Sequence, residues 1–215
     1  MYKFVFFDMD GTVLNTIDDL RNAVNHTMRH FGLPEIDTWQ CKHYTGNASR
    51  HLIRCSVPDG EDDPRFEEIY NFYVPYYRDH CAIETAPYDG ILWLMEQLKA
   101  AGVKMAVVSN KPDPAVKNLA DVWFPGLLEC AIGESPTVRR KPAPDTVFEA
   151  MKLMGASAEE SVYIGDTEVD IQTAANCGMD CIAVTWGFRD FEEIKDLGAK
   201  VYVDDCAALK DEILR

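Results

Sequence analysis

Acidic side chains occur in pairs at two places where the sequence predicts that a buried strand ends. Asp8 and Asp10 directly follow an apolar run over residues 2–7, and Asp166 and Asp170 follow a shorter run. Because the strands of an open α/β sheet present their ligand site at the carboxyl ends, we expect all four carboxylates to lie at one edge. Carboxylates so close together repel each other unless a cation is present. Oxygen ligands without His or Cys favour a hard ion, which in phosphate chemistry is usually Mg²⁺.

Three further polar residues are predicted near the same edge. Ser109 and Asn110 follow an apolar run, and Lys141 lies in a loop before Pro142. A carboxylate beside a metal ion can attack phosphorus, and a second carboxylate can protonate the leaving oxygen. A lysine and a hydroxyl can hold the charge of the transferring phosphoryl oxygens. Each of these residues alone is commonly a turn, a helix cap or a surface charge, but together and in order they indicate phosphoryl transfer.

The elements that position these residues alternate between strand and helix. Short apolar runs predict strands, whereas apolar residues at helical spacing predict helices between them, two of which end at Gly102 and Gly178. This order is typical of βαβ units in a parallel sheet with helices on both faces. The predicted strands cover residues 2–7, 104–108, 161–164, 181–184 and 200–203, and the predicted helices include residues 91–98, 147–153 and 169–177.

One segment interrupts the alternation. From Thr16 to Thr85 the apolar stripes have helical spacing and no strand is predicted. We therefore expect an all-helical cap over residues 16–85, inserted into an α/β core formed by residues 1–15 and 86–215. The fold class predicted is a Rossmann-like parallel sheet core with an inserted helical cap domain.

The composition excludes several kinds of partner. The 215 residues include 36 acidic and 21 basic side chains, a formal net charge of −15 that would repel nucleic acid and anionic membranes. The seven cysteines are odd in number and form no Cys-x-x-Cys pair, so we expect reduced thiols. No membrane span or signal peptide is recognised, and we expect a cytoplasmic location.

Four motifs together resemble those of the haloacid dehalogenase superfamily. Residues 8–13 (Asp-Met-Asp-Gly-Thr-Val) resemble its first motif and residues 107–111 (Val-Val-Ser-Asn-Lys) its second. Residues 141–142 (Lys-Pro) resemble the third, and residues 165–170 (Gly-Asp-Thr-Glu-Val-Asp) the fourth. The order and spread match over essentially the whole chain, and the resemblance implies a Rossmann-like core with a helical cap after the first motif.

The resemblance also implies a role for each motif residue. Asp8 is implied to be the nucleophile and a metal ligand, and Asp10 the general acid/base with its backbone carbonyl on the metal. Dehalogenases lack a carboxylate at the position of Asp10, so the resemblance favours a phosphatase. Asp166 and Asp170 are implied to complete the Mg²⁺ site. The implied phosphate-binding residues are Ser109, Asn110 and Lys141.

Within the superfamily the likeness is greatest to bacterial phosphoglycolate phosphatases, which implies a small phosphate ester as substrate. For 2-phosphoglycolate the carboxylate of the substrate needs a cation, for which Arg50 is the candidate, and Asn47 can reach the same group. The cap loop departs from the usual Gly-x-Gly, because here it is Gly46-Asn47-Ala48. The stretches that carry this likeness are residues 13–16, 19–20, 44–47, 87–91 and 185–188.

Other functions fit part of the same pattern. A sugar-phosphate mutase, a pyrophosphatase or a nucleotide phosphatase would keep all four motifs. A receiver-like regulatory module, in which an aspartyl phosphate is a signal, would also place acids and a lysine at strand ends. The cap and Asp10 argue against a receiver, because a receiver leaves its aspartate open to a kinase and does not hasten hydrolysis.

Overall fold

The computed structural model describes residues 1–215, and contacts within the chain divide it into two compact units. One unit comprises Met1–Leu14 and Pro87–Arg215, and the other comprises Asn15–Ala86. The chain passes from one unit to the other at two short strands, β2 (Leu14–Asn15) and β3 (Ala86–Pro87), which form a two-stranded sheet. No helix is both long enough and apolar enough to cross a membrane.

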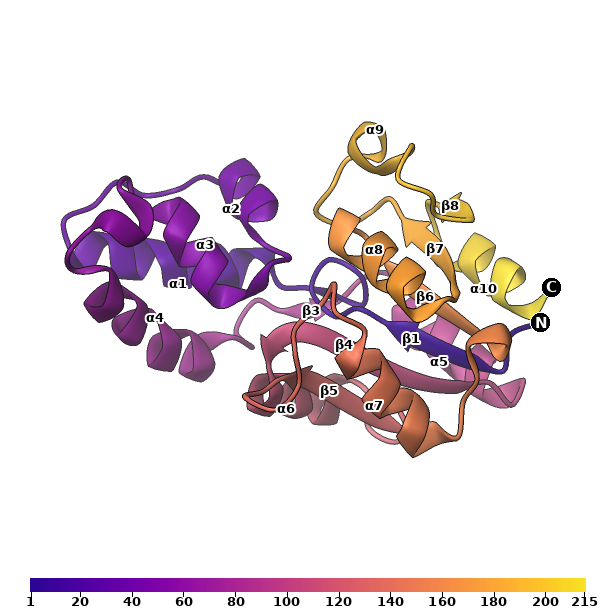
Figure 1. The fold of residues 1–215 in the computed structure, drawn as a ribbon. Helices are drawn as coiled ribbons and strands as arrows, with labels where there is room; N and C mark the ends of the chain where they lie inside the picture. The colour runs from indigo at the N-terminus through magenta and orange to yellow at the C-terminus, as the bar shows by residue number, and fades with distance from the viewer. The chain divides into compact units, whose positions relative to one another are not determined.

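A six-stranded parallel sheet forms the centre of the larger unit (Figure 1). From β1 the chain goes to β4 and β5 on one side, then returns to the other side of β1 for β6. This reversal makes the carboxyl end of β1 a topological switch point, where open α/β sheets bind ligands. The order across the sheet is β5 (Cys130–Glu134), β4 (Lys104–Pro112), β1 (Phe4–Phe7), β6 (Ser161–Gly165), β7 (Asp180–Val184) and β8 (Val201–Val203).

The central strand β1 is buried on both faces. Val5 and Phe7 belong to a core that they share with α5, α6 and α10, whereas Phe4 and Phe6 belong to a core shared with α7 and α8. Because successive side chains of a strand point to opposite faces, a strand covered on both sides is apolar throughout. The helices of this unit are α5 (Ile91–Ala100), α6 (Asp113–Trp123), α7 (Asp145–Met154), α8 (Glu168–Cys177), α9 (Phe191–Ile194) and α10 (Cys206–Leu214), with a 3₁₀ turn over Ala158–Glu160.

The smaller unit is built from helices. Its buried apolar residues include Leu20 and Met28 on the first helix and Ile69 and Tyr73 on the last, and these two helices pack against each other. The carboxylate of Asp19 is buried and accepts hydrogen bonds from residues 83–85. The helices are α1 (Ile17–His30), α2 (Thr38–Tyr44), α3 (Ala48–Ser56) and α4 (Phe66–His80), with a 3₁₀ turn over Gly60–Asp62.

The predicted fold class is confirmed, and all five predicted strands are present. The prediction missed β5, in which only Ile132 and Gly133 are buried, so its apolar pattern is weak. The end of the second predicted strand was also wrong. β4 continues to Pro112, with a shift in its pairing to β5 after Val108, so Ser109 and Asn110 lie within the strand.

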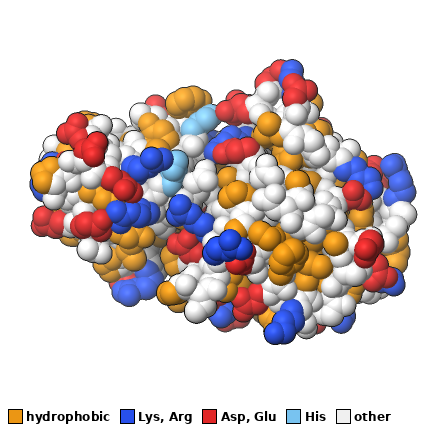
Figure 2. All heavy atoms as spheres, in the orientation of Figure 1, with side chains coloured by type: hydrophobic (Ala, Val, Ile, Leu, Met, Phe, Trp, Pro, Cys, Tyr) orange, Lys and Arg blue, Asp and Glu red, His pale blue; other side chains and the backbone are white.

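Acidic and basic side chains are interspersed on the face of the molecule shown in Figure 2. The net charge of −15 is therefore not gathered into one patch on that face. The seven cysteines are all free.

Candidate active site

The loop after β1 places Asp8 and Asp10 at the centre of the sheet edge. The backbone N–H of Asp8 bonds to the carbonyl of Ile164, which extends the pairing of β1 with β6 by one residue. The Asp8 carboxylate is buried, and Asp10 forms an ion pair with Lys111 at 3.1 Å. Gly11 has a φ of +88°, and a Cβ added there would lie 2.4 Å from a carboxylate oxygen of Asp166. Only glycine fits the turn that brings these acids together.

Lys141 lies at the centre of the buried charges. Its side chain is 2% exposed, and its ammonium nitrogen lies 2.6 Å from Asp8 Oδ1 and 2.8 Å from Asp170 Oδ1. It also donates to the hydroxyl of Tyr163 at 2.9 Å. The three N–H groups of the ammonium thus have three acceptors. Lys141 therefore joins the first, third and fourth motifs by direct contacts.

Asp166 and Asp170 are held by hydrogen bonds from their surroundings. Asp166 accepts from the Thr12 hydroxyl at 2.8 Å and from the backbone N–H of Phe188 at 2.7 Å. Asp170, in the first turn of α8, accepts from the backbone N–H and the hydroxyl of Thr167 through its second oxygen. A Cβ at Gly165 would lie 2.2 Å from the Cβ of Asp170, so the glycine gives this carboxylate its space. Both acids are therefore fixed before any ligand binds.

The electrostatic balance of the site favours an added cation. Burial raises the pKa of Asp8 well above its usual value; Lys141 opposes this, and Asp170 adds to it. Burial, with the charge of Asp170, raises the pKa of Asp166 to about 7. Burial also acts against ionisation of Asp170, but Lys141 and Thr167 outweigh it and hold that pKa below its usual value. The single positive charge of Lys141 does not balance the negative charges that three ionised buried carboxylates would carry.

The donor set fits a hard divalent cation. One oxygen from each of Asp8, Asp166 and Asp170 can be chosen so that all three lie within 4.8 Å of one another. All three residues are buried, and none of the donors is nitrogen or sulfur. This is the type of ligand that Mg²⁺ prefers.

The other predicted site residues lie in different surroundings. Ser109 is buried within β4, and its hydroxyl oxygen accepts from the backbone N–H of Lys111 at 3.2 Å. The Asn110 side chain bonds to the backbone of Lys141 through both its polar atoms. In the helical unit, Asn47 precedes the first residue of α3 and Arg50 lies in that helix.

Arg50 already has acidic partners within the helical unit. Its guanidinium lies 3.1 Å from Glu61 and 2.6 Å from Glu67, and it stacks over the rings of Phe66 and Tyr70. The ion pair with Glu67 is bidentate. Any anionic ligand of Arg50 would compete with these two carboxylates.

Sequence reasoning gave no role to several residues that contact the site. Lys111 and Thr12 belong to the quoted motifs, but only the structure shows that they pair with Asp10 and Asp166. Tyr163 was predicted only as part of an apolar strand, and its full burial agrees with that prediction. The backbone N–H of Phe188 has no signature in a sequence. The order of motifs could have suggested Lys111 and Thr12, but nothing signalled Tyr163.

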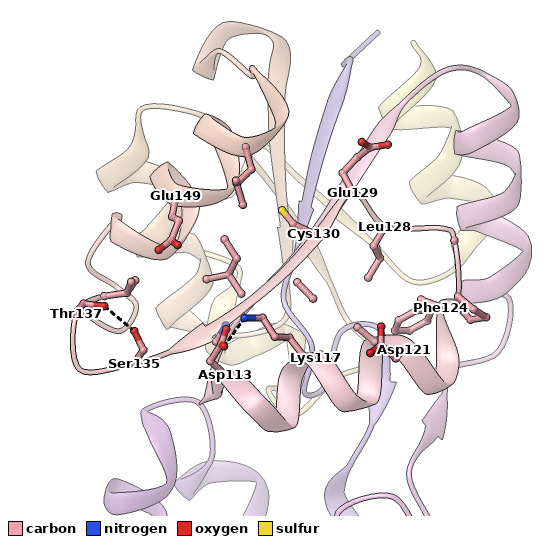
Figure 3. Close-up of a pocket in the computed structure, with 18 residues that line it drawn as sticks. Asp113, Lys117, Asp121, Phe124, Leu128, Glu129, Cys130, Ser135, Thr137 and Glu149 are labelled. Atoms are coloured by element: carbon pink, nitrogen blue, oxygen red, sulfur yellow. Dashed lines mark hydrogen bonds and ion pairs between the residues drawn. The ribbon is translucent and has the colours of Figure 1, made fainter.

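A separate cavity of about 510 Å³ lies along the edge strand β5. Figure 3 shows that residues of α6, such as Asp113 and Lys117, line one side of it and that Glu149 of α7 lines another. None of the predicted site residues is among its lining residues. The carboxylate site is therefore distinct from this cavity.

A switch point occupied by a buried carboxylate, a lysine and a candidate metal site defines a phosphoryl-transfer enzyme with a Rossmann-like core. Comparison with known proteins agrees with this class. The family model for haloacid dehalogenase-like hydrolases matches residues 5–184. The chain belongs to this family, and within it the chain is a phosphatase.

Similar proteins match over nearly the whole chain. The phosphoglycolate phosphatase of Rhodobacter capsulatus is 31% identical over 193 residues, covering 88% of this chain and 87% of that protein. The phosphoglycolate phosphatase of Chromobacterium violaceum is 29% identical over 214 residues, covering 97% of this chain and 95% of that protein. A crystal structure is known for a protein of Lactobacillus delbrueckii subsp. bulgaricus that is proposed to be a phosphoglycolate phosphatase. Its sequence is 38% identical to this chain, and the two structures align with a TM-score of 0.94 over 99% of this chain and 98% of that protein.

Proposed function

We propose that the chain is a Mg²⁺-dependent phosphatase that hydrolyses 2-phosphoglycolate through an aspartyl phosphate on Asp8. The observation that carries the mechanism is the 2.6 Å contact between Asp8 and the buried ammonium of Lys141, with the Asp10 carboxylate two residues away. The substrate is supported by the names of the similar proteins, which are phosphoglycolate phosphatases. The ligand is a small phosphate ester.

The reaction has two steps on the residues of this chain. In the first, an Asp8 oxygen attacks phosphorus, the bond to the leaving oxygen breaks, and Asp10 gives that oxygen a proton. In the second, Asp10 takes a proton from water, the water attacks the aspartyl phosphate, and Asp8 is released. Lys141 and the hydroxyl of Ser109 donate to the phosphoryl oxygens as their charge redistributes. The side chain of Asn110 positions Lys141 by its hydrogen bonds to the Lys141 backbone.

Carboxylates of Asp8, Asp166 and Asp170 and the backbone carbonyl of Asp10 would hold the Mg²⁺ ion. When bound, Mg²⁺ supplies positive charge that keeps Asp8 ionised and offsets the charge of the phosphoryl group. The hydrogen bonds that Asp170 accepts through both of its oxygens would keep this metal ligand in a fixed orientation.

The cap residues Asn47 and Arg50 would bind the carboxylate of the leaving group. A planar guanidinium suits a carboxylate because two parallel hydrogen bonds can form. Arg50 would exchange Glu61 or Glu67 for the substrate.

The test is Mg²⁺-dependent phosphate release over a panel of 2-phosphoglycolate, pyrophosphate, sugar phosphates, nucleotides and an aryl phosphate. We expect release to be fastest from 2-phosphoglycolate and to be lost in Asp8→Asn. Faster release from another ester would contradict 2-phosphoglycolate as the substrate but would still agree with the proposed mechanism. A matched control is Asp121→Asn, because Asp121 is an exposed aspartate beside the β5 cavity and should be dispensable.

Asp10→Asn tests the acid/base role separately. Steady turnover should fall to background, whereas a good aryl leaving group, which needs no proton, should still phosphorylate Asp8 once. A single burst of aryl alcohol without continued release is the expected signature. Unchanged turnover in this variant would contradict the role of Asp10.

A further inference from the structure

The hydroxyl of Tyr163 takes part in the buried network around Lys141. The Tyr163 side chain is fully buried on β6, two residues before Gly165. Its oxygen accepts a hydrogen bond from the Lys141 ammonium at 2.9 Å and donates one to Asp170 Oδ1 at 3.1 Å. An ammonium cannot accept a hydrogen bond and an ionised carboxylate cannot donate one, so the directions of both hydrogen bonds are fixed. The phenol proton therefore points to Asp170.

Three acceptors fix the orientation of the Lys141 ammonium. Two of them, Tyr163 and Asp170, bond to each other and form a single unit. The third, Asp8, is the residue that receives the phosphoryl group in the proposed reaction. The N–H group directed at Asp8 is thus the one that faces the reacting atoms, while the other two are occupied by Tyr163 and Asp170.

We propose that Tyr163 is a positioning residue for phosphoryl transfer, whose hydroxyl fixes the Lys141 ammonium so that one N–H is directed at the phosphoryl oxygens beside Asp8. This inference rests on the proposed function, since it assigns Tyr163 a part in that reaction. The alternative is that Tyr163 only fills the core, in which case its ring matters and its hydroxyl does not. Substitution by Phe separates the two, because the ring is kept.

The first experiment compares Tyr163→Phe with Tyr202→Phe. The Tyr202 hydroxyl also has two partners, the backbone carbonyls of Ile194 and Lys195, but lies on β8. We expect both variants to show lower urea midpoints. Only Tyr163→Phe should lose kcat/KM for phosphate release, by about tenfold or more, which corresponds to about 1.4 kcal/mol. Equal kcat/KM in Tyr163→Phe and the native protein would overturn the proposal.

The second experiment asks whether Tyr163 acts through Lys141. In a Lys141→Met background the ammonium is absent, so adding Tyr163→Phe should cause no further loss of kcat/KM with an aryl phosphate. A full tenfold loss in that background would show that the hydroxyl acts by another route and would also overturn the proposal.

A third measurement does not depend on activity. In the Mg²⁺-free protein the Lys141 ammonium protons, identified by their absence in Lys141→Met, should exchange with water measurably faster in Tyr163→Phe when followed by NMR. Unchanged exchange would count against positioning. If the native protein released no phosphate from any ester, the proposed function would fail, while this measurement would still decide whether Tyr163 holds Lys141.

Discussion

The side chain of Asn110 and the backbone of Lys141 are joined by two reciprocal hydrogen bonds. The amide nitrogen of Asn110 donates to the Lys141 carbonyl at 2.9 Å, and its amide oxygen accepts from the Lys141 backbone N–H at 2.6 Å. All of these groups are buried. Asn110 lies near the end of β4, so the strand fixes the loop that carries Lys141. In the proposed reaction Asn110, which the sequence predicted to bind phosphate, would therefore act through Lys141.

The first prediction concerns Asn110→Ala. Removing the amide leaves a buried N–H and a buried carbonyl of Lys141 without these partners, so the free energy of unfolding should fall by roughly 2 kcal/mol. The freed loop should also lower kcat/KM by at least about tenfold. Urea unfolding and steady-state phosphate release measure the two effects.

Asn176→Ala is the matched control for this prediction. Its amide donates to the carbonyl of Pro142, next to Lys141, but at an exposed site where water can replace it. We expect a change in unfolding free energy within about 0.5 kcal/mol and unchanged kcat/KM. Equal effects of the two substitutions would mean that the hydrogen bonds of Asn110 position this loop no better than that of Asn176, which would contradict the prediction.

The second prediction links pH and Mg²⁺ through Asp166. The pKa of its buried carboxyl is raised to about 7, above the usual value of about 4. Between these two values the folded protein keeps a proton that the unfolded chain has lost. The unfolding free energy of the Mg²⁺-free protein should therefore fall as pH rises from about 4 to 7, by up to about 1.4 kcal/mol per unit from this group.

Bound Mg²⁺ should remove this loss of stability. The stabilisation by Mg²⁺, measured as the difference in melting temperature between MgCl₂ and EDTA, should be larger at pH 8 than at pH 5, because the ligands are ionised at the higher pH. The subtraction cancels titrations that do not involve the metal. A difference of the same size at both pH values, or none at either, would show that the carboxylate cluster is not the metal site.

The sequence predicted most of the fold because strands of a parallel sheet are apolar throughout. The run ending at Phe7 is buried on both faces and could be recognised without its neighbours. At the edge of the sheet this signal fails. Residues 130–134 of β5 include a glycine and a glutamate, and their pairing with β4 is a tertiary contact that no local pattern encodes.

The candidate site was predictable to the extent that strand ends converge. Asp8, Asp166 and Asp170 were predicted from strand topology alone, and the structure brings them within a few ångström of one another. The sequence could not show which side chains form hydrogen bonds and ion pairs with each other in the site. The pairing of Lys111 with Asp10 depends on side-chain conformation, and so does the contact of Tyr163 with Lys141.

The third prediction concerns substrate choice by the cap. Arg50→Ala should raise KM for 2-phosphoglycolate by about tenfold or more but leave KM for an aryl phosphate, which has no carboxylate, nearly unchanged. Arg65→Ala is the matched control, because Arg65 also forms a bidentate ion pair within the cap, with Asp63. If both substitutions changed KM for both esters alike, Arg50 would have a structural role only, through Glu61 and Glu67.

The fourth prediction concerns Asp19, which holds the segment returning from the helical unit. Its carboxylate accepts from the backbone N–H groups of Ile83, Glu84 and Thr85 and from the Thr85 hydroxyl at 2.8 Å. Asp19→Ala leaves these donors without that acceptor in a largely buried place. The free energy of unfolding should fall by about 3 kcal/mol, because hydrogen bonds to a charged acceptor are among the stronger ones.

Asp18→Ala serves as the control for Asp19. Asp18 precedes it on α1, but its carboxylate is about half exposed and pairs only with Arg21. Surface ion pairs contribute little, so we expect a loss below about 1 kcal/mol. The comparison is made by urea unfolding followed by circular dichroism, which reports the helices directly. If Asp19→Ala were no more destabilising than Asp18→Ala, water would satisfy the three N–H groups equally well, and the carboxylate would not be what holds this segment in place.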